Sequence, residues 1–254
     1  MVKTPTPMHG RGPAIAALDP WVSSAGRMHQ LLTDDQRAQL AVMSSIARFK
    51  KREIIYREGD LAESVFAINT GVVAAYKEAP DGRKHIAEFL FADDLFGLSA
   101  EGKYTNSTKA ITEVTAYRLP VTTLRRRLSK DAELEFYVVC KLCQELRQAQ
   151  HHAFLLSERK AVTKLAMFFQ LIEGLQMARG QQTAEIYLPM DHSDIGSYVG
   201  MTLPAVSRAF KALTTRGVIK LRDRGHVTIV DRDAFDKIAG DPPAPLATAL
   251  PGRD

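Results

Sequence analysis

The spacing of apolar residues changes at Pro120, and this change constrains the fold more than any other feature of the chain. Before Pro120, short apolar runs nearly alternate with polar residues, which predicts β-strands. The predicted strands cover 54–56, 65–68, 71–76, 85–90 and 113–119. Turn signals such as residues 80–83 (Pro-Asp-Gly-Arg) recur at the spacing of a barrel or jelly roll. Beyond Pro120 the spacing is helical, so the chain is predicted to be an α+β protein with its β part first.

A long helix is predicted from about 131 to 157. Its apolar positions lie four, three, four and three residues apart, at Leu142, Leu146, Ala149, Ala153 and Leu156. This spacing is typical of the a/d seam of a coiled coil. The seam would either pack on its own domain or pair two parallel chains, and the helix length, beyond about twenty residues, favours a homodimer.

The segment 191–213 carries the most specific motif of the chain, two short helices joined by a tight turn. Asp191 is placed to cap the first helix, and Gly196 lets the second helix approach closely. Gly200 supplies the left-handed residue of the turn, and Pro204 suits the first turn of the second helix. The pattern predicts a helix-turn-helix, whose second helix reads bases in the major groove of DNA.

Base-reading residues are predicted on the exposed face of this second helix, at Leu203, Pro204, Ser207 and Arg208. Arg208 is the strongest candidate because a guanidinium bridges O6 and N7 of guanine. The segment 217–230 predicts a hairpin wing beside the helix. Phosphate contacts are predicted for Thr202, which also suits the cap of the second helix, and for Lys211, Arg216, Arg222 and Arg224.

The composition agrees with a soluble protein that binds nucleic acid. The chain has 254 residues, 45% of them hydrophobic, and a formal net charge of +5. No apolar run approaches the roughly eighteen residues of a membrane span, and the N-terminus lacks a secretory pattern. These observations predict a cytoplasmic protein with two domains, no membrane partner and a double-stranded DNA partner.

Two cysteines, Cys140 and Cys143, form a C-x-x-C pair inside the predicted long helix. Such a pair suggests either redox chemistry or half of a metal site. No strand precedes it, as a thioredoxin-like motif requires, so small core or interface residues are favoured. The adjacent His151 and His152 lie beside no plausible nucleophile, and no cluster has metal-ligand spacing, so neither an enzyme nor a metal site is predicted.

The order of these parts resembles the CRP/FNR family of bacterial transcription factors, and the strings at 194–202, 206–208 and 80–83 look most similar to its FixK-like branch. The resemblance covers about 31 to 238 and implies an N-terminal β-roll (a cyclic-nucleotide-binding-like jelly roll), a long dimerisation helix and a C-terminal winged helix-turn-helix. The expected domains are a disordered or loosely attached segment at 1–28, the β-roll sensor or effector domain at 29–130, the dimerisation helix at 131–157, the DNA-binding domain at 158–239 and a flexible tail at 240–254.

Pro204 departs from the family's base-reading pattern. The family reads DNA with a motif of the type E-x-x-S-R, in which the acid accepts from cytosine and the arginine contacts guanine. Ser207 and Arg208 match this motif, but Pro204 stands in place of the acid. Because proline has no acceptor for the cytosine amino group, the half-site is expected to keep the guanine under Arg208 and to change at the neighbouring pair.

The resemblance also raises the question of a small ligand in the β-roll. Cyclic-nucleotide binders of the family use a Gly-Glu pair and then an arginine, but here Leu98 follows Gly97 and no arginine occurs between Arg83 and Arg118. Lys109 is a poor substitute because it lacks the bidentate fork. The candidate pocket consists of Gly97, Leu98, Asn106, Ser107, Thr108 and Lys109. Action without cyclic AMP or another cofactor is expected, and the alternative is a regulator gated by a cyclic nucleotide or haem.

Other sensors and contacts follow from the same resemblance. An FNR-type iron-sulfur cluster would need cysteines near the N-terminus, but the chain has none before Cys140. A haem would need axial ligands, for which His85 with Met28 or His29 are the candidates. In this family the exposed hairpin of the roll touches RNA polymerase. The candidates for that contact are Lys77, Glu78, Asp81, Arg83 and Lys84, although a solvated polar turn explains them equally well.

Overall fold

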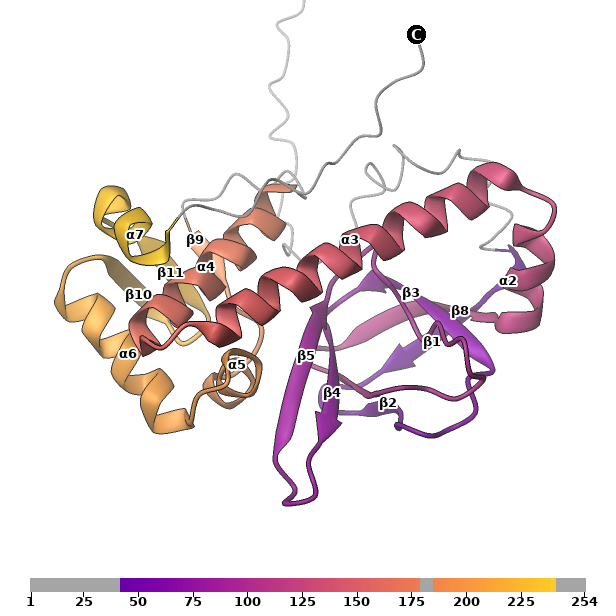
Figure 1. Cartoon of the computed structure of the whole chain (residues 1–254), viewed down its shortest axis with the longest axis horizontal. Coiled ribbons are helices and arrows are strands. Elements are labelled where there is room, and N and C mark those ends of the chain that lie inside the picture. Colours follow the sequence, from indigo (N-terminus) through magenta and orange to yellow (C-terminus); the bar gives the residue numbers. More distant parts are fainter. Residues whose placement is uncertain (1–41, 179–184, 241–254) are drawn as a thin grey trace, which may run out of the picture.

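The structure is a computed structural model that describes residues 42–178 and 185–240. A β-roll and a C-terminal domain of helices around a small sheet lie side by side, and the long helix α3 (Ala132–Ser157) runs along both (Figure 1). The predicted α+β class, with its roll, long helix and winged helix-turn-helix, is confirmed. The predicted flexible ends, 1–28 and 240–254, lie outside the described residues except for Gly240.

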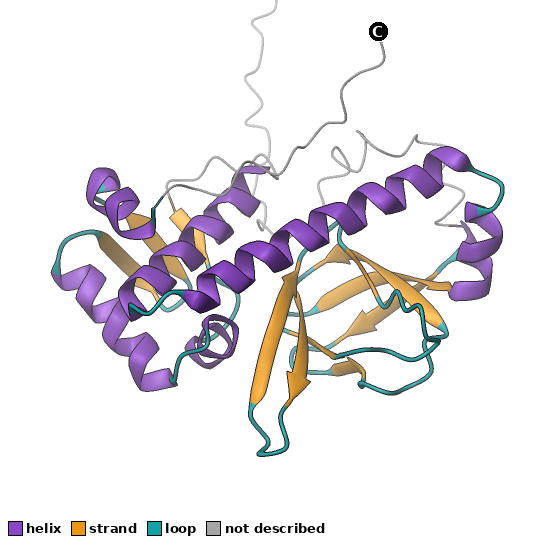
Figure 2. Cartoon of the chain, viewed as in Figure 1, coloured by secondary structure: helices purple, strands orange, loops and turns teal. Residues whose placement is uncertain are grey.

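The β-roll consists of two four-stranded antiparallel sheets (Figure 2). One sheet has the order β1-β8-β3-β6 and the other β2-β7-β4-β5. The strands are β1 (Ser45–Phe49), β2 (Ile54–Tyr56), β3 (Ser64–Thr70), β4 (Val73–Glu78), β5 (Lys84–Leu90), β6 (Leu95–Phe96), β7 (Ser107–Ala110) and β8 (Val114–Pro120). Alternation in the sequence predicted β2, β3, β4, β5 and β8. It missed β1, whose residues are mostly exposed, β6, which has two residues, and β7, which is mostly polar.

Aromatic side chains fill the interior of the roll. The rings of Tyr56 and Tyr104 stack with their centroids 3.6 Å apart, and Phe66 and Phe96 stack at 5.0 Å. All four side chains are buried together with aliphatic residues from both sheets. Burial of this apolar surface stabilises the packing of the two sheets.

Helix α2 (Val121–Leu128) follows the roll and leads into α3. Asp131 caps α3 by accepting a hydrogen bond from the amide of Leu134 at 3.0 Å. The whole predicted a/d seam of α3 is exposed in the single chain: Leu142, Leu146, Ala149, Ala153 and Leu156. Helix α3 therefore packs on its own domains through its other faces and leaves the seam unpartnered.

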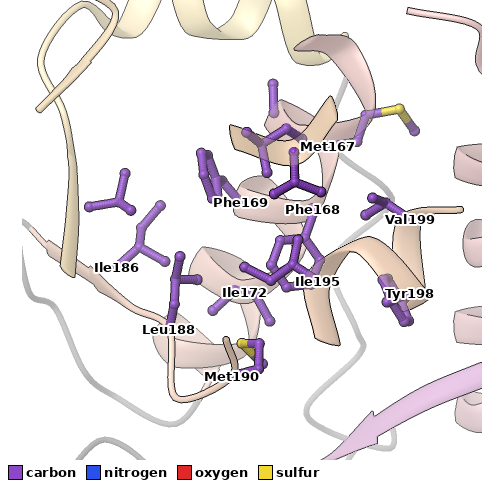
Figure 3. Close-up of a cluster of buried hydrophobic side chains, with 14 of the residues drawn as sticks. Met167, Phe168, Phe169, Ile172, Ile186, Leu188, Met190, Ile195, Tyr198 and Val199 are labelled. Atoms are coloured by element: carbon purple, nitrogen blue, oxygen red, sulfur yellow. The ribbon is translucent and has the colours of Figure 1, made fainter. Parts of the chain in front are cut away.

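The C-terminal domain has its own core. It contains α4 (Ala161–Ala178), α5 (His192–Val199), α6 (Leu203–Thr215) and α7 (Arg232–Ala239) around a sheet of order β10-β11-β9. The strands are β9 (Glu185–Tyr187), β10 (Ile219–Asp223) and β11 (His226–Ile229). Figure 3 shows Phe168 and Phe169 of α4 with Ile195 and Val199 of α5 in this core, where all four are fully buried. This core supports α5 and α6, the two helices of the predicted motif.

Candidate nucleic-acid interface

Helices α5 and α6 form the predicted helix-turn-helix. Asp191 caps α5, because its carboxylate accepts a hydrogen bond from the amide of Asp194 at 2.9 Å. Gly200 ends α5 in the left-handed conformation, at φ 67°. A Cβ atom on Gly196 would lie 2.7 Å from the carbonyl oxygen of Met201, so only glycine allows this approach of the turn. The predicted roles of these three residues are confirmed.

The orientation of α6 follows from its buried side. Val206, Phe210 and Leu213 are buried, as predicted. The ring of Phe210 packs edge-on against Phe169 of α4, with the ring centroids 5.3 Å apart. It also stacks on His192 of α5, with the centroids 4.3 Å apart. Contacts on two sides prevent α6 from rotating about its axis and therefore determine which of its side chains face solvent.

The opposite face of α6 brings the predicted base readers together. Leu203, Pro204, Ser207 and Arg208 are all exposed and lie within the first two turns of the helix. Helix α5 packs on strand β5 of the roll, whereas α6 lies on the outer side of its domain, away from the roll (Figure 1). The face is therefore free to enter a groove, while the base contacts themselves stay a prediction.

Two of the residues predicted to contact phosphates differ from expectation. Thr202 is at the N-cap position of α6, but its side chain makes no cap hydrogen bond, so the predicted cap is wrong in that respect. Arg222 is engaged by two carboxylates, Glu185 at 2.7 Å and Asp223 at 3.6 Å. It would have to leave both to reach a phosphate. Lys211, Arg216 and Arg224 are exposed and form no salt bridge within 42–178 and 185–240.

Lys109 is not where the pocket prediction placed it. Its ammonium donates to the carboxylate of Asp194 in α5 at 2.6 Å, and both side chains are largely shielded from solvent. The cause is the alternation of strand β7, which buries Thr108 and Ala110 and turns Lys109 to the opposite face. Lys109 therefore connects the roll to the helix-turn-helix instead of facing the inside of the roll.

The other pocket candidates differ in their exposure and in their contacts. Thr108 is fully buried, Leu98 is exposed, and Ser107 accepts a hydrogen bond from the amide of Glu58 at 2.9 Å. A Cβ atom on Gly97 would lie 3.3 Å from the ring of Tyr104. The backbone at Gly97 therefore lies directly against the Tyr104 ring of the roll interior.

A second contact between the domains is centred on Tyr198 of α5. Its ring packs on Phe89 of β5 at 5.3 Å and stacks on His152 of α3 at 3.9 Å. An imidazole nitrogen of His152, Nε2, lies 2.7 Å from the carbonyl oxygen of Tyr198. Sequence reasoning missed this contact, because nothing local in these three segments indicates that they meet.

Beside Tyr198 lies a cavity of about 130 Å³, lined by residues of β5, α3, α4 and α5. Its lining includes two carboxyl groups, those of Glu88 and Glu145. Burial, and then the charges of Asp94 and Glu145, raise the pKa of Glu88 to about 8. Burial and the charge of Asp94 raise the pKa of Glu145 to about 7. The folded protein therefore favours the uncharged, protonated forms of both carboxyl groups.

A Glu88→Gln variant should make the protein less sensitive to alkaline pH. Because the folded-state pKa of Glu88 lies above the ordinary value of 4.5, its contribution to stability is full below pH 4.5 and is lost as the pH rises towards 8. Glutamine avoids this loss, so between pH 5.5 and pH 8.5 we expect the stability of the variant relative to the wild type to rise by on the order of 3 kcal/mol. Urea unfolding at pH 5.5 and pH 8.5 measures the difference.

The matched control is Glu78→Gln, which removes an exposed carboxylate from the neighbouring strand β4. The interpretation is wrong if Glu88→Gln and the wild type differ by the same free energy at both pH values. It is also wrong if the control reproduces the pH-dependent gain.

The remaining sequence candidates lie apart from the helix-turn-helix. The polymerase candidates are on the β4–β5 hairpin: Lys77 pairs with Glu58 at 2.7 Å, Asp81 with Arg83 at 2.6 Å, and Lys84 lies over the ring of Tyr76. Glu78 is exposed beside them.

The cysteines and the candidate haem ligands do not come together as a redox or metal site in the part of the chain that the structure describes. Cys140 and Cys143 are free thiols on α3, and His85 is exposed on β5. Met28 and His29 lie outside the described residues. Within 42–178 and 185–240, no three His, Cys, Asp or Glu side chains gather as a metal site, and no helix is both long and apolar enough to cross a membrane.

Comparison with known proteins assigns both domains. Residues 46–131 match the model of the cyclic nucleotide-binding domain, and residues 163–238 match the Crp-like helix-turn-helix domain. The nitrogen fixation regulation protein FixK of Azorhizobium caulinodans is 28% identical over 78% of this chain and 81% of its own length. The fumarate and nitrate reduction regulatory protein of Escherichia coli is 27% identical over 75% of this chain and 77% of its own length.

Among solved structures, that of FixK2 from Bradyrhizobium japonicum is similar over 78% of this chain and 98% of its own length. The two are 29% identical, with a TM-score of 0.70. The share of this chain that is covered exceeds either domain alone, so the likeness extends over more than one of its parts.

Proposed function

Because the chain belongs to the CRP/FNR family of transcription regulators and carries the family's helix-turn-helix DNA-binding domain, we propose that it acts as a homodimer on a two-fold symmetric promoter site. The observation that carries the proposal is the exposed face of α6 with Ser207 and Arg208 in its second turn. The protein works where promoter DNA is, in the cytoplasm.

The dimer is supported by the unpartnered seam of α3. Its apolar a and d positions are exposed in the single chain, and Leu146 has 61% of its surface in water. Burial of such a stripe against its own copy gives a parallel coiled coil. In that arrangement the two α6 helices are related by two-fold symmetry, which a palindromic site matches.

We further propose that the β-roll supports DNA binding without cyclic AMP. Two features favour this: stacked rings occupy the interior of the roll, and Lys109, the one cation among the candidate pocket residues, is paired with Asp194. The roll then serves as a scaffold that holds α5 and α6 through Lys109 and Tyr198. Its β4–β5 hairpin offers RNA polymerase an exposed, mixed-charge surface that projects from the roll (Figure 1).

Selection from randomised duplexes, followed by gel shifts with the purified full chain, tests the proposal. We expect a palindromic consensus with a guanine in each half-site and an affinity that added cyclic AMP does not change. The proposal of sequence-specific binding fails if no duplex is preferred over competitor DNA. The proposal of ligand-free action fails if binding requires cyclic AMP.

A further inference from the structure

Helix α5 is the part of the C-terminal domain that packs on the β-roll. It lies between α6 and strand β5 (Figure 1). Asp194 and Tyr198 are four residues apart, so both side chains lie on one face of α5. The carboxylate of Asp194 accepts a hydrogen bond from Lys109 of β7 at 2.6 Å, and the ring of Tyr198 packs on Phe89 of β5. Because α5 also packs on α6, a shift of α5 on the roll would carry α6 with it.

The covalent link between the roll and the C-terminal domain is short and by itself allows rotation. Helix α3 ends at Ser157 and α4 begins at Ala161, so residues 158–160 join them. At Glu158 the backbone is extended, with ψ 143°, so α4 does not continue the axis of α3. Rotation about a few backbone bonds of such a link turns a whole domain. The orientation of α6 therefore depends on noncovalent contacts, among them those of α5.

The two contacts on this face of α5 differ in how strongly they prefer one position. Ring packing is non-directional, so Tyr198 would keep apolar neighbours if α5 turned slightly. The ion pair is stricter, because only 21% of the Lys109 side chain and 15% of the Asp194 side chain are exposed. A displaced α5 would leave a largely shielded charge without its partner, which is costly. The exposed pair of Arg52 and Asp191, 4.0 Å apart, imposes no such condition.

We propose that the ion pair of Lys109 and Asp194 determines which spacing between half-sites the protein accepts. This inference rests on the proposed function, a homodimer on a two-fold site, and adds two residues that control specificity without touching DNA. In a symmetric dimer, any turn of one C-terminal domain is repeated in the other. One additional base pair moves a half-site by about 3.4 Å and rotates it by about 35°. Two α6 helices that are held firmly match one spacing, whereas two that turn freely follow several.

Palindromes that differ only in spacing test the proposal. The selected half-sites are placed at the selected spacing and with one base pair added or removed, and the affinity of the full chain is measured by fluorescence anisotropy. Wild type should prefer the selected spacing by about tenfold, as much as one mismatched base pair typically costs. Lys109→Met and Asp194→Asn should each reduce this preference about fivefold. The ratio of two affinities cancels the effect of each substitution on the net charge.

Further variants show whether the two residues act through their contact. The double variant, Lys109→Met with Asp194→Asn, should lose no more preference than either single variant, because one ion pair is lost only once. Lys109→Arg keeps the charge and should retain most of the preference. Lys77→Met is the matched control: it removes the lysine of another ion pair, 2.7 Å from Glu58 within the roll, and should leave the preference unchanged.

A duplex with one half-site separates a positioning role from a structural one. The single variants should prefer the selected half-site over a scrambled one as strongly as wild type does, because one half-site has no spacing. If they lose this preference as well, the ion pair supports the helix-turn-helix itself and the inference is wrong.

The other results separate this inference from the proposed function. If wild type prefers one sequence but binds all spacings equally well, the inference is wrong and DNA binding stands. It is equally wrong if a single variant keeps the wild-type preference for spacing, if the losses of the two single variants add up in the double variant, or if Lys77→Met loses as much. If wild type prefers no sequence, the proposed function fails first.

Discussion

Replacing Arg208 with alanine is expected to remove most of the sequence specificity and to leave weak, salt-dependent binding to any DNA. Arg208 is exposed in the second turn of α6, and its guanidinium suits O6 and N7 of guanine. One such bidentate contact discriminates by about 1–3 kcal/mol, so a dimer with two half-sites should lose about 2–6 kcal/mol, or at least about 30-fold in affinity. Gel shifts on the selected site measure the loss of specific affinity, and gel shifts on a scrambled duplex measure the remaining binding to any DNA.

Lys211→Ala is the matched control, because Lys211 is exposed on the same helix but is predicted to contact a phosphate. It should weaken binding to both duplexes by a similar factor and reduce the salt dependence. If Arg208→Ala still prefers the selected site as strongly as wild type does, Arg208 is not the guanine reader.

Leu146→Glu is expected to convert the protein to a monomer and, through this, to weaken binding to the palindromic site. Leu146 lies at an a position in the middle of the α3 seam, where a parallel dimer would bring two glutamates together in an apolar core. An uncompensated buried charge costs about 3–5 kcal/mol, which corresponds to more than about a hundredfold in dimerisation. Sedimentation equilibrium measures the oligomeric state.

The variant should still fold, because Leu146 is largely exposed in the single chain. Arg147→Glu is the control: it introduces the same carboxylate at the next residue, outside the seam, and should leave the dimer intact. A Leu146→Glu protein that remains dimeric at wild-type concentrations would contradict the use of this seam. On a duplex that holds one half-site, the Leu146→Glu monomer should bind with an affinity comparable to that of one wild-type subunit.

The helix-turn-helix could be predicted because its determinants are local. Asp191 caps its own helix three residues on, Gly200 adopts a conformation that glycine prefers, and Gly196 lies where the turn crosses the helix. Each signal needs only residues close by in the chain. The same holds for the β-strands with regular alternation and for the a/d seam of α3.

The pocket was predicted less well because strand register is not a local property. Residues 107–110 are mostly polar, so no alternation shows which of them face the interior. The resemblance alone placed Lys109 in a pocket, and nothing local shows that its partner is Asp194, 85 residues away in the other domain. The ion pair of Arg222 was not predicted for a similar reason, because Glu185 lies on strand β9, 37 residues earlier in the chain.

The sequence by itself determined which helix is suited to read DNA, through caps, glycines and the choice of Leu203, Pro204, Ser207 and Arg208. Only the tertiary structure decided how that helix is held: Tyr198 packs between β5 and α3, and Lys109 binds α5. The physical reason is that caps and turns depend on neighbours within a few residues, whereas a contact between domains requires two surfaces that meet only after each has folded.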